Sequence, residues 1–444
     1  MILSKCQTID TTCIEYVHPW SNSCVLASLS LLAPCIKESL RIYIAAYSLT
    51  LLFKGKIPTK KDLKNTVLGI LQSCLFLTSH GVGYSAVLCL IRRIIGNYNF
   101  YTVSFIPSFL SSILSILIER PSRRALLSLY VTNVASETLF RMAVSRKLVK
   151  PIRYGEVLIF ALSISNLLYF YKGHGLPKDA VYSLLRFLVG PSEEKDYVKQ
   201  DEQVFLASDQ KEINKNHFSL YEQIIQWYKS KILKLKSLSL HSCCPHYHSC
   251  VHNAFSSGFQ KFVKGYVVQV AIKVIINFKK ITKRPNLLFD IPLRMETFNL
   301  GLCLGLFATL YRGVSCALRR LLDCDNKLIA FPAGFVAGLS FYFYRDNSIA
   351  LYFMWKTFQI FYNFAGENGY VPELPLAPVF LHALSTAILF HVAIVEPLNL
   401  RTSYWNFLQA MSGGRIALMD RRCIDAFGLD TSKSLEKVLA RSRR

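Results

Sequence analysis

Charged residues are scarce in this chain: Asp, Glu, Lys and Arg make up 18% of its 444 residues. Soluble globular domains carry about 25% of such residues. Hydrophobic residues reach 52%. A chain with so little charge and so many apolar residues is typical of a membrane protein and argues against an ordinary soluble enzyme.

Acidic residues are especially few, with 28 Asp and Glu against 52 Lys and Arg, and the formal net charge is +24. Such an excess of basic residues often indicates a nucleic-acid partner. Here, however, Lys and Arg lie in the short gaps between apolar runs. This placement favours contact with the lipid bilayer and its anionic headgroups, and we expect no nucleic-acid partner.

Several familiar signals are also missing. The chain has no Walker loop, no strand-associated GxGxxG, no HExxH and no GxSxG, so we expect no enzymatic activity, no catalytic residues and no organic cofactor. It has neither an N-terminal apolar core typical of a secretory signal peptide nor a C-terminal Ser-Lys-Leu, so any targeting signal is expected to be internal. Its thirteen cysteines, several of them inside apolar runs, do not form the disulfide framework of a secreted domain.

Long apolar runs dominate what is present. About 20 apolar residues are needed to cross a bilayer as a helix. Five runs qualify clearly, namely 66–91, 100–118, 298–318, 329–344 and 376–395. Five more are shorter or contain polar residues, namely 39–53, 125–144, 155–171, 262–278 and 347–365. The runs lack the alternation of membrane strands, so they predict an all-α integral membrane protein with eight to ten spans.

Three stretches of the first half recur in the same order in the second half. YSAVLCLIRR at 84–93 returns as YRGVSCALRR at 311–320. The stretch 105–126 then parallels 330–351, and 157–168 parallels 379–390. Three matches in order predict an internal duplication that produces two homologous lobes of four to five helices each.

The expected domain organisation follows from this repeat. It comprises an N-terminal Cys/His-containing segment, a first membrane lobe, a polar linker, a second membrane lobe and a basic C-terminal tail, at 1–35, 36–190, 191–261, 262–410 and 411–444. Within the linker, a basic amphipathic helix is predicted around Trp227. Its apolar face is formed by Tyr221, Ile224, Ile225, Tyr228, Ile232 and Leu235. Such a helix lies either at a membrane interface or against the protein's own loops.

Small residues four positions apart mark sites where two helix backbones approach closely. The second half contains Gly301 and Gly305 in one run and Gly334 and Gly338 in another, while Ser111 and Ser115 hold the comparable spacing in the first half. We expect these residues at helix contacts or along a groove.

Arginines at the ends of the apolar runs predict anchors at the membrane interface, namely Arg92, Arg93, Arg120, Arg319, Arg320 and Arg345. Glu137 and Arg141 lie four residues apart in one run, and a carboxylate in a membrane segment is a functional candidate. The alternative is a helix at the bilayer surface or one facing another helix. His80 is the one mid-segment histidine of interest, with a buried, hydrogen-bonded side chain as its simpler interpretation.

Cysteine and histidine residues crowd one dozen-residue stretch of the linker, comprising Cys243, Cys244, His246, His248, Cys250 and His252. Thiolates and imidazoles at this density can hold tetrahedral zinc, although the spacing matches no standard zinc finger. Lipidated or redox-active cysteines and plain loop residues are the alternatives. A second group, Cys13, His18 and Cys24, either completes this site or forms another.

The chain resembles the transmembrane protein 135 (peroxisomal membrane protein 52) family from about His18 to Gly428. The most specific segments are LIERPSRR at 117–124 and ASETLFRM at 135–142. Further matching segments are ESLRIY at 38–43, GEVLIF at 155–160, LRFLVG at 185–190, AGFVAGLSFYFY at 333–344, SYWNFL at 403–408 and IDAFG at 424–428. The second half is also similar to the four-helix subunits of mitochondrial inner-membrane protein translocases.

The resemblance implies a multi-pass protein of peroxisomal and mitochondrial membranes. It implies a role in the balance of mitochondrial fission and fusion, with the dynamin-like fission GTPase as a partner, and in lipid and peroxisome homeostasis. It carries over no catalytic residues. The rival expectation is translocation of a lipid or polypeptide along a groove. The helices that carry Gly301 and Gly334 would be among those that line this groove.

Overall fold

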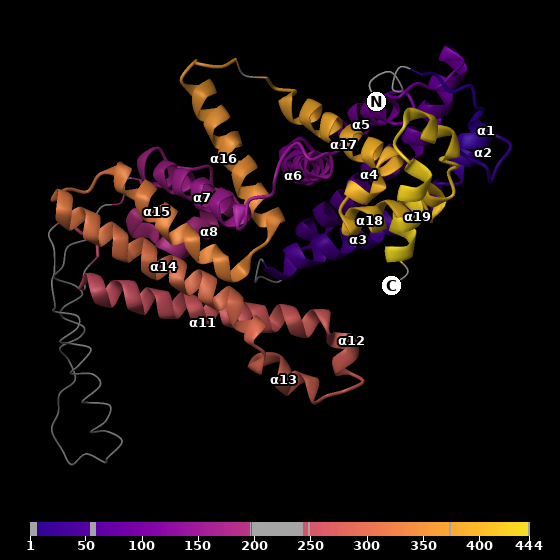
Figure 1. Ribbon diagram of the computed structural model, residues 1–444. Coiled ribbons are helices and arrows are strands. Elements are labelled where there is room, and N and C mark those ends of the chain that lie inside the picture. The colour runs from indigo at the N-terminus through magenta and orange to yellow at the C-terminus, as the bar shows by residue number, and fades with distance from the viewer. Residues whose placement is uncertain are drawn as a thin grey trace, which may run out of the picture. The chain divides into compact units, whose positions relative to one another are not determined.

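The computed structural model describes residues 7–53, 59–195, 197, 243–246, 249–372 and 374–442. Throughout these residues the regular secondary structure is helical (Figure 1), and the one β-type pairing is an isolated bridge between Ile9 and Tyr98. The predicted all-α fold class is therefore confirmed.

The chain divides into two compact units, and the first of these combines residues Met1–Pro151 with Gly369–Arg444. Its longer helices are α3 (Leu32–Phe53), α4 (Lys60–Ile95), α5 (Phe105–Ile116), α6 (Pro121–Ser145), α17 (Ala377–Val395) and α19 (Thr431–Ser442). Its shorter helices are α1 (Cys13–Tyr16), α2 (Cys24–Leu29) and α18 (Thr402–Met411).

The second unit covers residues Ile152–Asn368. Its helices are α7 (Gly155–Gly173), α8 (Ala180–Val189), α11 (Cys250–Ile276), α12 (Phe278–Ile281), α13 (Leu287–Leu293), α14 (Met295–Leu322), α15 (Ala330–Gly338) and α16 (Asn347–Glu367). A 3₁₀ segment, η4 (Leu339–Tyr344), follows α15 directly.

The helices of the two units pack in the same pattern. In the first unit α4 packs against α3 and α5, and α17 packs against α5 and α6. In the second unit α14 packs against α11 and α15, and α7 packs against α15 and α16, beside which it lies in Figure 1. The units therefore differ from the expected stretches 36–190 and 262–410, because α7 belongs to the second unit and α17 to the first.

Four helices are long and apolar enough to cross a membrane in the described part of the chain, namely Lys60–Ile95, Met295–Leu322, Lys327–Tyr344 and Ala377–Val395. The expected eight to ten spans are not reached, although each expected run overlaps a helix. The 12 residues of α5 rise about 18 Å, short of the roughly 30 Å hydrocarbon core. Helix α6 carries the charged Glu137 and Arg141, which lower its hydropathy.

The C-terminal residues form part of a folded core. Ile416, Ile424, Phe427 and Leu435 are buried with the end of α17 and with Trp405 of α18. The stretch 411–442 is consequently part of the first unit and differs from the appended tail that its basic composition predicted.

The expected linker 191–261 is described only in part. Its last residues belong to helix α11, which begins at Cys250. The predicted amphipathic helix, with Tyr221 to Leu235 on its apolar face, lies outside the described residues.

Local sequence signals account for the ends of the longest helix. Thr59 and Asp62 form a capping box at the start of α4, in which each side chain bonds the other residue's backbone N–H. Gly96 ends the helix in the left-handed conformation, with φ of 83°, which glycine adopts without a Cβ clash. Between these caps α4 extends over 36 residues and positions Cys89 and Arg92 in its last turns.

Candidate metal centres

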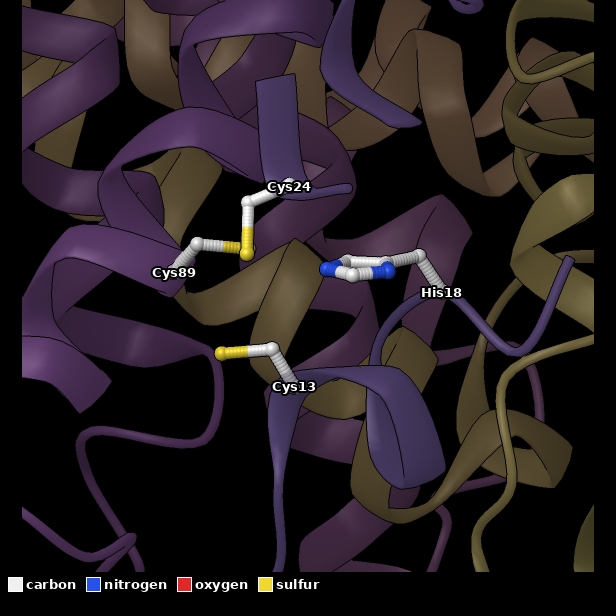
Figure 2. A group of neighbouring side chains, drawn as sticks. All are labelled: Cys13, His18, Cys24 and Cys89. Atoms are coloured by element: carbon white, nitrogen blue, oxygen red, sulfur yellow. The ribbon is translucent and has the colours of Figure 1, made fainter. Parts of the chain in front are cut away.

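Four residues from separate parts of the first unit form the first Cys/His cluster, namely Cys13, His18, Cys24 and Cys89. Cys13 begins α1, His18 follows that helix, Cys24 begins α2, and Cys89 lies on α4. Figure 2 shows their side chains directed toward a common space. The three sulfur atoms and one imidazole nitrogen all lie within 4.8 Å of one another.

His18 is oriented as metal-binding histidines are. It is fully buried, and its Nδ1 donates to the Ser21 carbonyl at 2.8 Å. That hydrogen bond fixes the tautomer and leaves the lone pair on Nε2. Nε2 is buried and has no hydrogen-bond partner within the described part of the chain. An unpartnered buried nitrogen is costly, and a ligand at this position would satisfy it.

The surroundings of Cys13 favour its thiolate. The pKa of Cys13 lies below its ordinary value, chiefly because Cys89 hydrogen-bonds its sulfur and this effect outweighs burial. The Tyr98 hydroxyl also donates to Cys13 Sγ at 3.4 Å. One turn beyond Cys89, Arg92 donates from Nε to the Thr11 carbonyl at 2.7 Å and pairs with Asp10. The end of α4 thus holds the segment that carries Cys13.

The second Cys/His cluster lies in the second unit and consists of Cys244, His246, Cys250 and Cys316. Cys250 begins α11, and Cys316 lies on α14. Their ligand atoms again lie within 4.8 Å of one another. The Cys244 and Cys250 sulfur atoms are 3.8 Å apart, and His246 Nε2 is 3.2 Å from Cys316 Sγ. All three cysteines are buried.

Positive charge adjoins the second cluster too. Arg320 Nη2 lies 3.8 Å from Cys250 Sγ. The pKa of Cys244 lies below its ordinary value, chiefly because Cys316 hydrogen-bonds its sulfur, against the opposing effect of burial. Depressed thiol pKa values are typical of cysteines that bind metals or react as thiolates.

Both clusters have donors and dimensions that suit a tetrahedral metal ion. Zinc with Zn–S bonds of about 2.3 Å places neighbouring sulfur atoms roughly 3.8 Å apart. The cluster atoms lie within 4.8 Å, so small side-chain rotations suffice to close either site. Every cysteine of the two clusters is a free thiol, and each cluster can hold a metal ion.

Sequence reasoning found three members of each cluster. The predicted trio Cys13, His18 and Cys24 lies in the first cluster, and the predicted Cys244, His246 and Cys250 lie in the second. Cys243 and His252 are outside it: the Cys243 thiol donates to the Asp323 carbonyl, and His252 follows Cys250 on α11. His248 lies outside the described residues.

The fourth member of each cluster was missed. Cys89 and Cys316 lie in the apolar runs 66–91 and 298–318, where a cysteine usually packs as a small hydrophobe. They occupy the same place in the twin segments YSAVLCLIRR and YRGVSCALRR. That correspondence was the signal that could have identified them.

The predicted glycines lie in helix contacts. A Cβ on Gly301 would meet the Phe262 carbonyl oxygen at 2.8 Å, and one on Gly305 would meet the Gly258 carbonyl at 3.0 Å, both across the α11–α14 contact. Gly334 and Gly338 of α15 meet the α7 backbone at Ser165 and Ala161, with Cβ distances of 2.9 and 2.6 Å to the respective Cα atoms. Such contacts exclude any larger residue without a shift of the helices.

The two serines are also buried, on the short helix α5. Ser111 donates to the His80 carbonyl of α4 at 3.0 Å, and Ser115 donates to the Ser112 carbonyl within its own helix. Ser111 therefore helps to join α5 to α4.

The predicted arginine anchors separate into two groups. Arg93, Arg320 and Arg345 are exposed, as an anchor requires. Arg92 is engaged with Asp10, and Arg120 donates to the Gln72 side chain and the Asn65 carbonyl.

Arg319 contradicts the prediction of an interface anchor. It is 1% exposed and binds both carboxylate oxygens of Glu193, at 2.7 and 2.6 Å, and Asp325 at 2.9 Å. Its guanidinium is enclosed in this ion-pair network, which Lys172 joins, so it does not reach lipid headgroups.

Glu137 is buried on α6 and bound by two arginines, Arg141 at 2.6 Å and Arg401 at 3.1 Å. It therefore faces another part of its own unit. His80 is buried on α4, with its ring against Phe390 of α17 and Nδ1 3.4 Å from the Ser112 hydroxyl. Glu137 and His80 share no hydrogen-bond partner among the described residues.

Residues 10–144 match a family model described as the N-terminal cysteine-rich region of Transmembrane protein 135. This match supports the transmembrane protein 135 family. The matched stretch contains the whole first cluster, from Cys13 to Cys89. No solved structure matches the chain. The expected likeness of the second half to translocase subunits stays a prediction.

Proposed function

We propose that this chain is a non-enzymatic, multi-pass protein of mitochondrial and peroxisomal membranes that regulates the balance of mitochondrial fission and fusion, together with lipid and peroxisome homeostasis. The observation that carries the proposal is the match of residues 10–144 to the transmembrane protein 135 region, together with four helices among the described residues that are long and apolar enough to cross a membrane. A membrane location agrees with both.

The absence of enzymatic activity is part of the proposal. Each Cys/His cluster offers four protein ligands, which is the composition of closed, structural metal sites, whereas catalytic zinc keeps an open position. Glu137 is occupied by two arginines, and His80 lies in helix packing. These polar groups therefore do not converge on a reactive centre.

We also propose that the two units descend from one duplicated ancestor. The twin sequence segments support it, and so does the common packing pattern, in which α17 contacts α5 and α6 as α7 contacts α15 and α16. In this scheme α7 and α17 are equivalent helices of the two halves, and each belongs to the unit formed mainly by the other half.

Partner binding would use exposed basic residues. Arg93, Arg320 and Arg345 are exposed near helix ends, where they can contact anionic headgroups or an acidic protein surface. We propose the dynamin-like fission GTPase as a partner, because the family resemblance implies it.

The alternative function is translocation of a lipid or polypeptide along a helix-lined groove. A groove needs Gly301, Gly305, Gly334 and Gly338 to line an open concavity, whereas a scaffold needs them in helix contacts. All four lie against neighbouring backbones in the structure. This observation favours the non-translocating proposal.

Organelle imaging with accessibility mapping tests the proposal. The tagged chain should co-localise with mitochondrial and peroxisomal membranes, and its removal should change the distribution of mitochondrial lengths. Protease-accessible tags at both termini and at residues 198–242 should be digested from the cytosolic side. A chain confined to another membrane, or unchanged mitochondrial lengths after its removal, would contradict the proposal.

A further inference from the structure

The two Cys/His clusters are built alike. In each, the ligands follow the order Cys, His, Cys and Cys, and the first three precede the helix that carries the last. The third ligand opens a helix behind a serine N-cap, Ser23 before Cys24 and Ser249 before Cys250. Cys24 precedes Cys89 by 65 positions, and Cys250 precedes Cys316 by 66.

This correspondence is not required by helix packing. A buried cysteine packs as a small hydrophobe wherever space allows, and Cys35, Cys74 and Cys303 are buried outside both clusters. In both units, by contrast, three thiols and one imidazole lie close together. This is the composition of a set of metal ligands. We infer that each unit binds one zinc ion in a Cys₃His site, formed by Cys13, His18, Cys24 and Cys89 in the first unit and by Cys244, His246, Cys250 and Cys316 in the second.

The choice of zinc follows from the donors. Thiolate sulfur is a soft ligand that disfavours magnesium and calcium, which prefer oxygen. A closed tetrahedral Cys₃His set is typical of structural zinc sites. The buried Nε2 of His18, whose Nδ1 is already bound to Ser21, supplies the imidazole donor in the tautomer that zinc requires.

The charge around each site also suits zinc. A Zn²⁺ ion with three thiolates and a neutral imidazole carries a net charge of −1. In the second unit the guanidinium of Arg320 lies beside Cys250 and can neutralise that charge. In the first unit the Tyr98 hydroxyl donates to Cys13, and the Arg92 guanidinium stacks over the Tyr98 ring at 5.7 Å. Hydrogen bonds and cations around thiolate ligands stabilise such sites.

In each unit, zinc would hold the segment that carries the first three ligands against the helix that carries the fourth. The fourth ligand lies near the arginine-containing end of that helix. In the first unit the segment contains α1 and α2, of four and six residues. Helices this short do not persist on their own in water. Coordination by Cys89 would fix both of them against α4 at a position one turn before Arg92. This role is independent of the proposed organelle function.

Acylation and disulfide formation fit the same residues less well. Cys244, Cys250 and Cys316 are buried, so an acyl chain could not be attached without opening the unit. One disulfide per cluster would use two thiols and leave the third thiol and the buried imidazole without a role. A four-ligand site uses every member of the cluster.

Zinc content of the full-length chain tests the inference. The protein is purified in detergent under reducing conditions, and metal is measured by mass spectrometry per mole of chain. We expect about two zinc ions in the native chain, about one in Cys89→Ser and in Cys316→Ser, and none in the double variant. Matched controls are Cys423→Ser in the first unit and Cys324→Ser in the second, which lie outside the clusters and should keep both ions.

A second measurement does not depend on the variants folding. Titration of the native chain with an organomercurial should release about two zinc ions as the cluster thiols react, and a colorimetric chelator reports the release. Cobalt(II) exchanged into the sites should show the visible absorption of tetrahedral cobalt thiolates. A native chain without zinc, disulfides within the clusters, or equal zinc content in the cluster and control variants would overturn the inference.

Discussion

Arg319 and Arg421 are both enclosed by protein, and each is stabilised differently. Arg319 is surrounded by the carboxylates of Glu193 and Asp325. Arg421 has no carboxylate partner among the described residues, and it donates to backbone carbonyls of Ala393, Ile394 and Ile416 at 2.7 to 3.0 Å. Ala393 and Ile394 belong to the last turn of α17, where carbonyls lack helical partners and attract cations.

Replacing Arg421 by Met should destabilise the first unit. Burial lowers the pKa of Arg421 to about 10, so it remains charged at neutral pH. Its loss would leave the Ala393 and Ile394 carbonyls without the guanidinium donor, which costs about 1–3 kcal/mol. The thermal unfolding midpoint of the purified chain should therefore fall. The control is Arg422→Met, since Arg422 is exposed and pairs with the nearby Asp420. Equal midpoints for the two variants would refute this role.

The tertiary contacts of single residues were the least predictable part of this structure. The sequence indicates that Arg319 and Arg421 are basic, but only the fold places Glu193 against one and the end of α17 against the other. Likewise the trio Cys13, His18 and Cys24 is visible as a local pattern. Cys89 joins it through a tertiary contact, which local periodicity does not encode.

At the level of elements, α11 and α14 pack against each other through glycine on both helices. Gly258 and Gly265 of α11 face Gly305 and Gly301 of α14, so the two backbones approach closely. Without a hydrophobic driving force between helices in lipid, packing of this kind provides much of the stability.

Gly301→Ala should weaken the α11–α14 contact. Its Cβ would lie 2.8 Å from the Phe262 carbonyl oxygen, a backbone atom that cannot turn aside. Overpacking of this kind costs about 1–3 kcal/mol. The matched control on the same helix is Gly313→Ala, where a Cβ meets nothing within 4 Å. Alanine there should be neutral or stabilising by up to about 1 kcal/mol.

Thermal unfolding in detergent, followed by size-exclusion chromatography, measures both variants. The expected order of midpoints is Gly313→Ala at or above the native chain and Gly301→Ala below it. The reverse order would show that the close approach of the two helices is unimportant for stability.

Helix positions were largely predictable, because long apolar runs specify where helices form. All ten expected runs overlap helices in the structure. Their lengths were less predictable: the run 100–118 gives a helix of only 12 residues, since Asn99 and Thr102 form a turn at its start. A polar side chain that bonds the backbone nearby interrupts a run that composition alone treats as continuous.

At the scale of the molecule, the first compact unit combines two separate stretches of chain, whereas the second is one continuous stretch. α17 completes the unit formed mainly by residues before Pro151, and α7 belongs to the unit that ends at Asn368. The repeat in the sequence predicts two similar groups of helices. It cannot predict whether α7 or α17 joins a given group. The twin segments 157–168 and 379–390 in these two helices have similar apolar patterns.

Cutting the chain within residues 198–242 should produce two fragments that depend on each other. The N-terminal fragment would lack α17, and the C-terminal fragment would lack α7. Each unit would lose a helix that packs against two neighbours, and its apolar contact face would be exposed. Expressed alone, each fragment should aggregate. Expressed together, they should co-purify as a soluble complex in detergent.

Affinity purification through a tag on one fragment, followed by detection of the other, measures the association. A control cut in the loop at Gly369–Val371 separates α17 from α16 without separating α7 from its unit. Its C-terminal fragment should associate with the rest through α17. Fragments from the first cut that are each monodisperse alone would contradict the mutual dependence.

The exchanged helices also impose an order on biosynthesis. Roughly 230 residues separate the end of α6 at Ser145 from the start of α17 at Ala377, and ribosomes add about 5–20 residues per second. For some tens of seconds α5 and α6 therefore exist without the helix that covers them. α7 is likewise synthesised before α15 and α16, the helices against which it packs. We therefore expect the nascent chain to expose apolar helix faces over this period and to need protection from premature association.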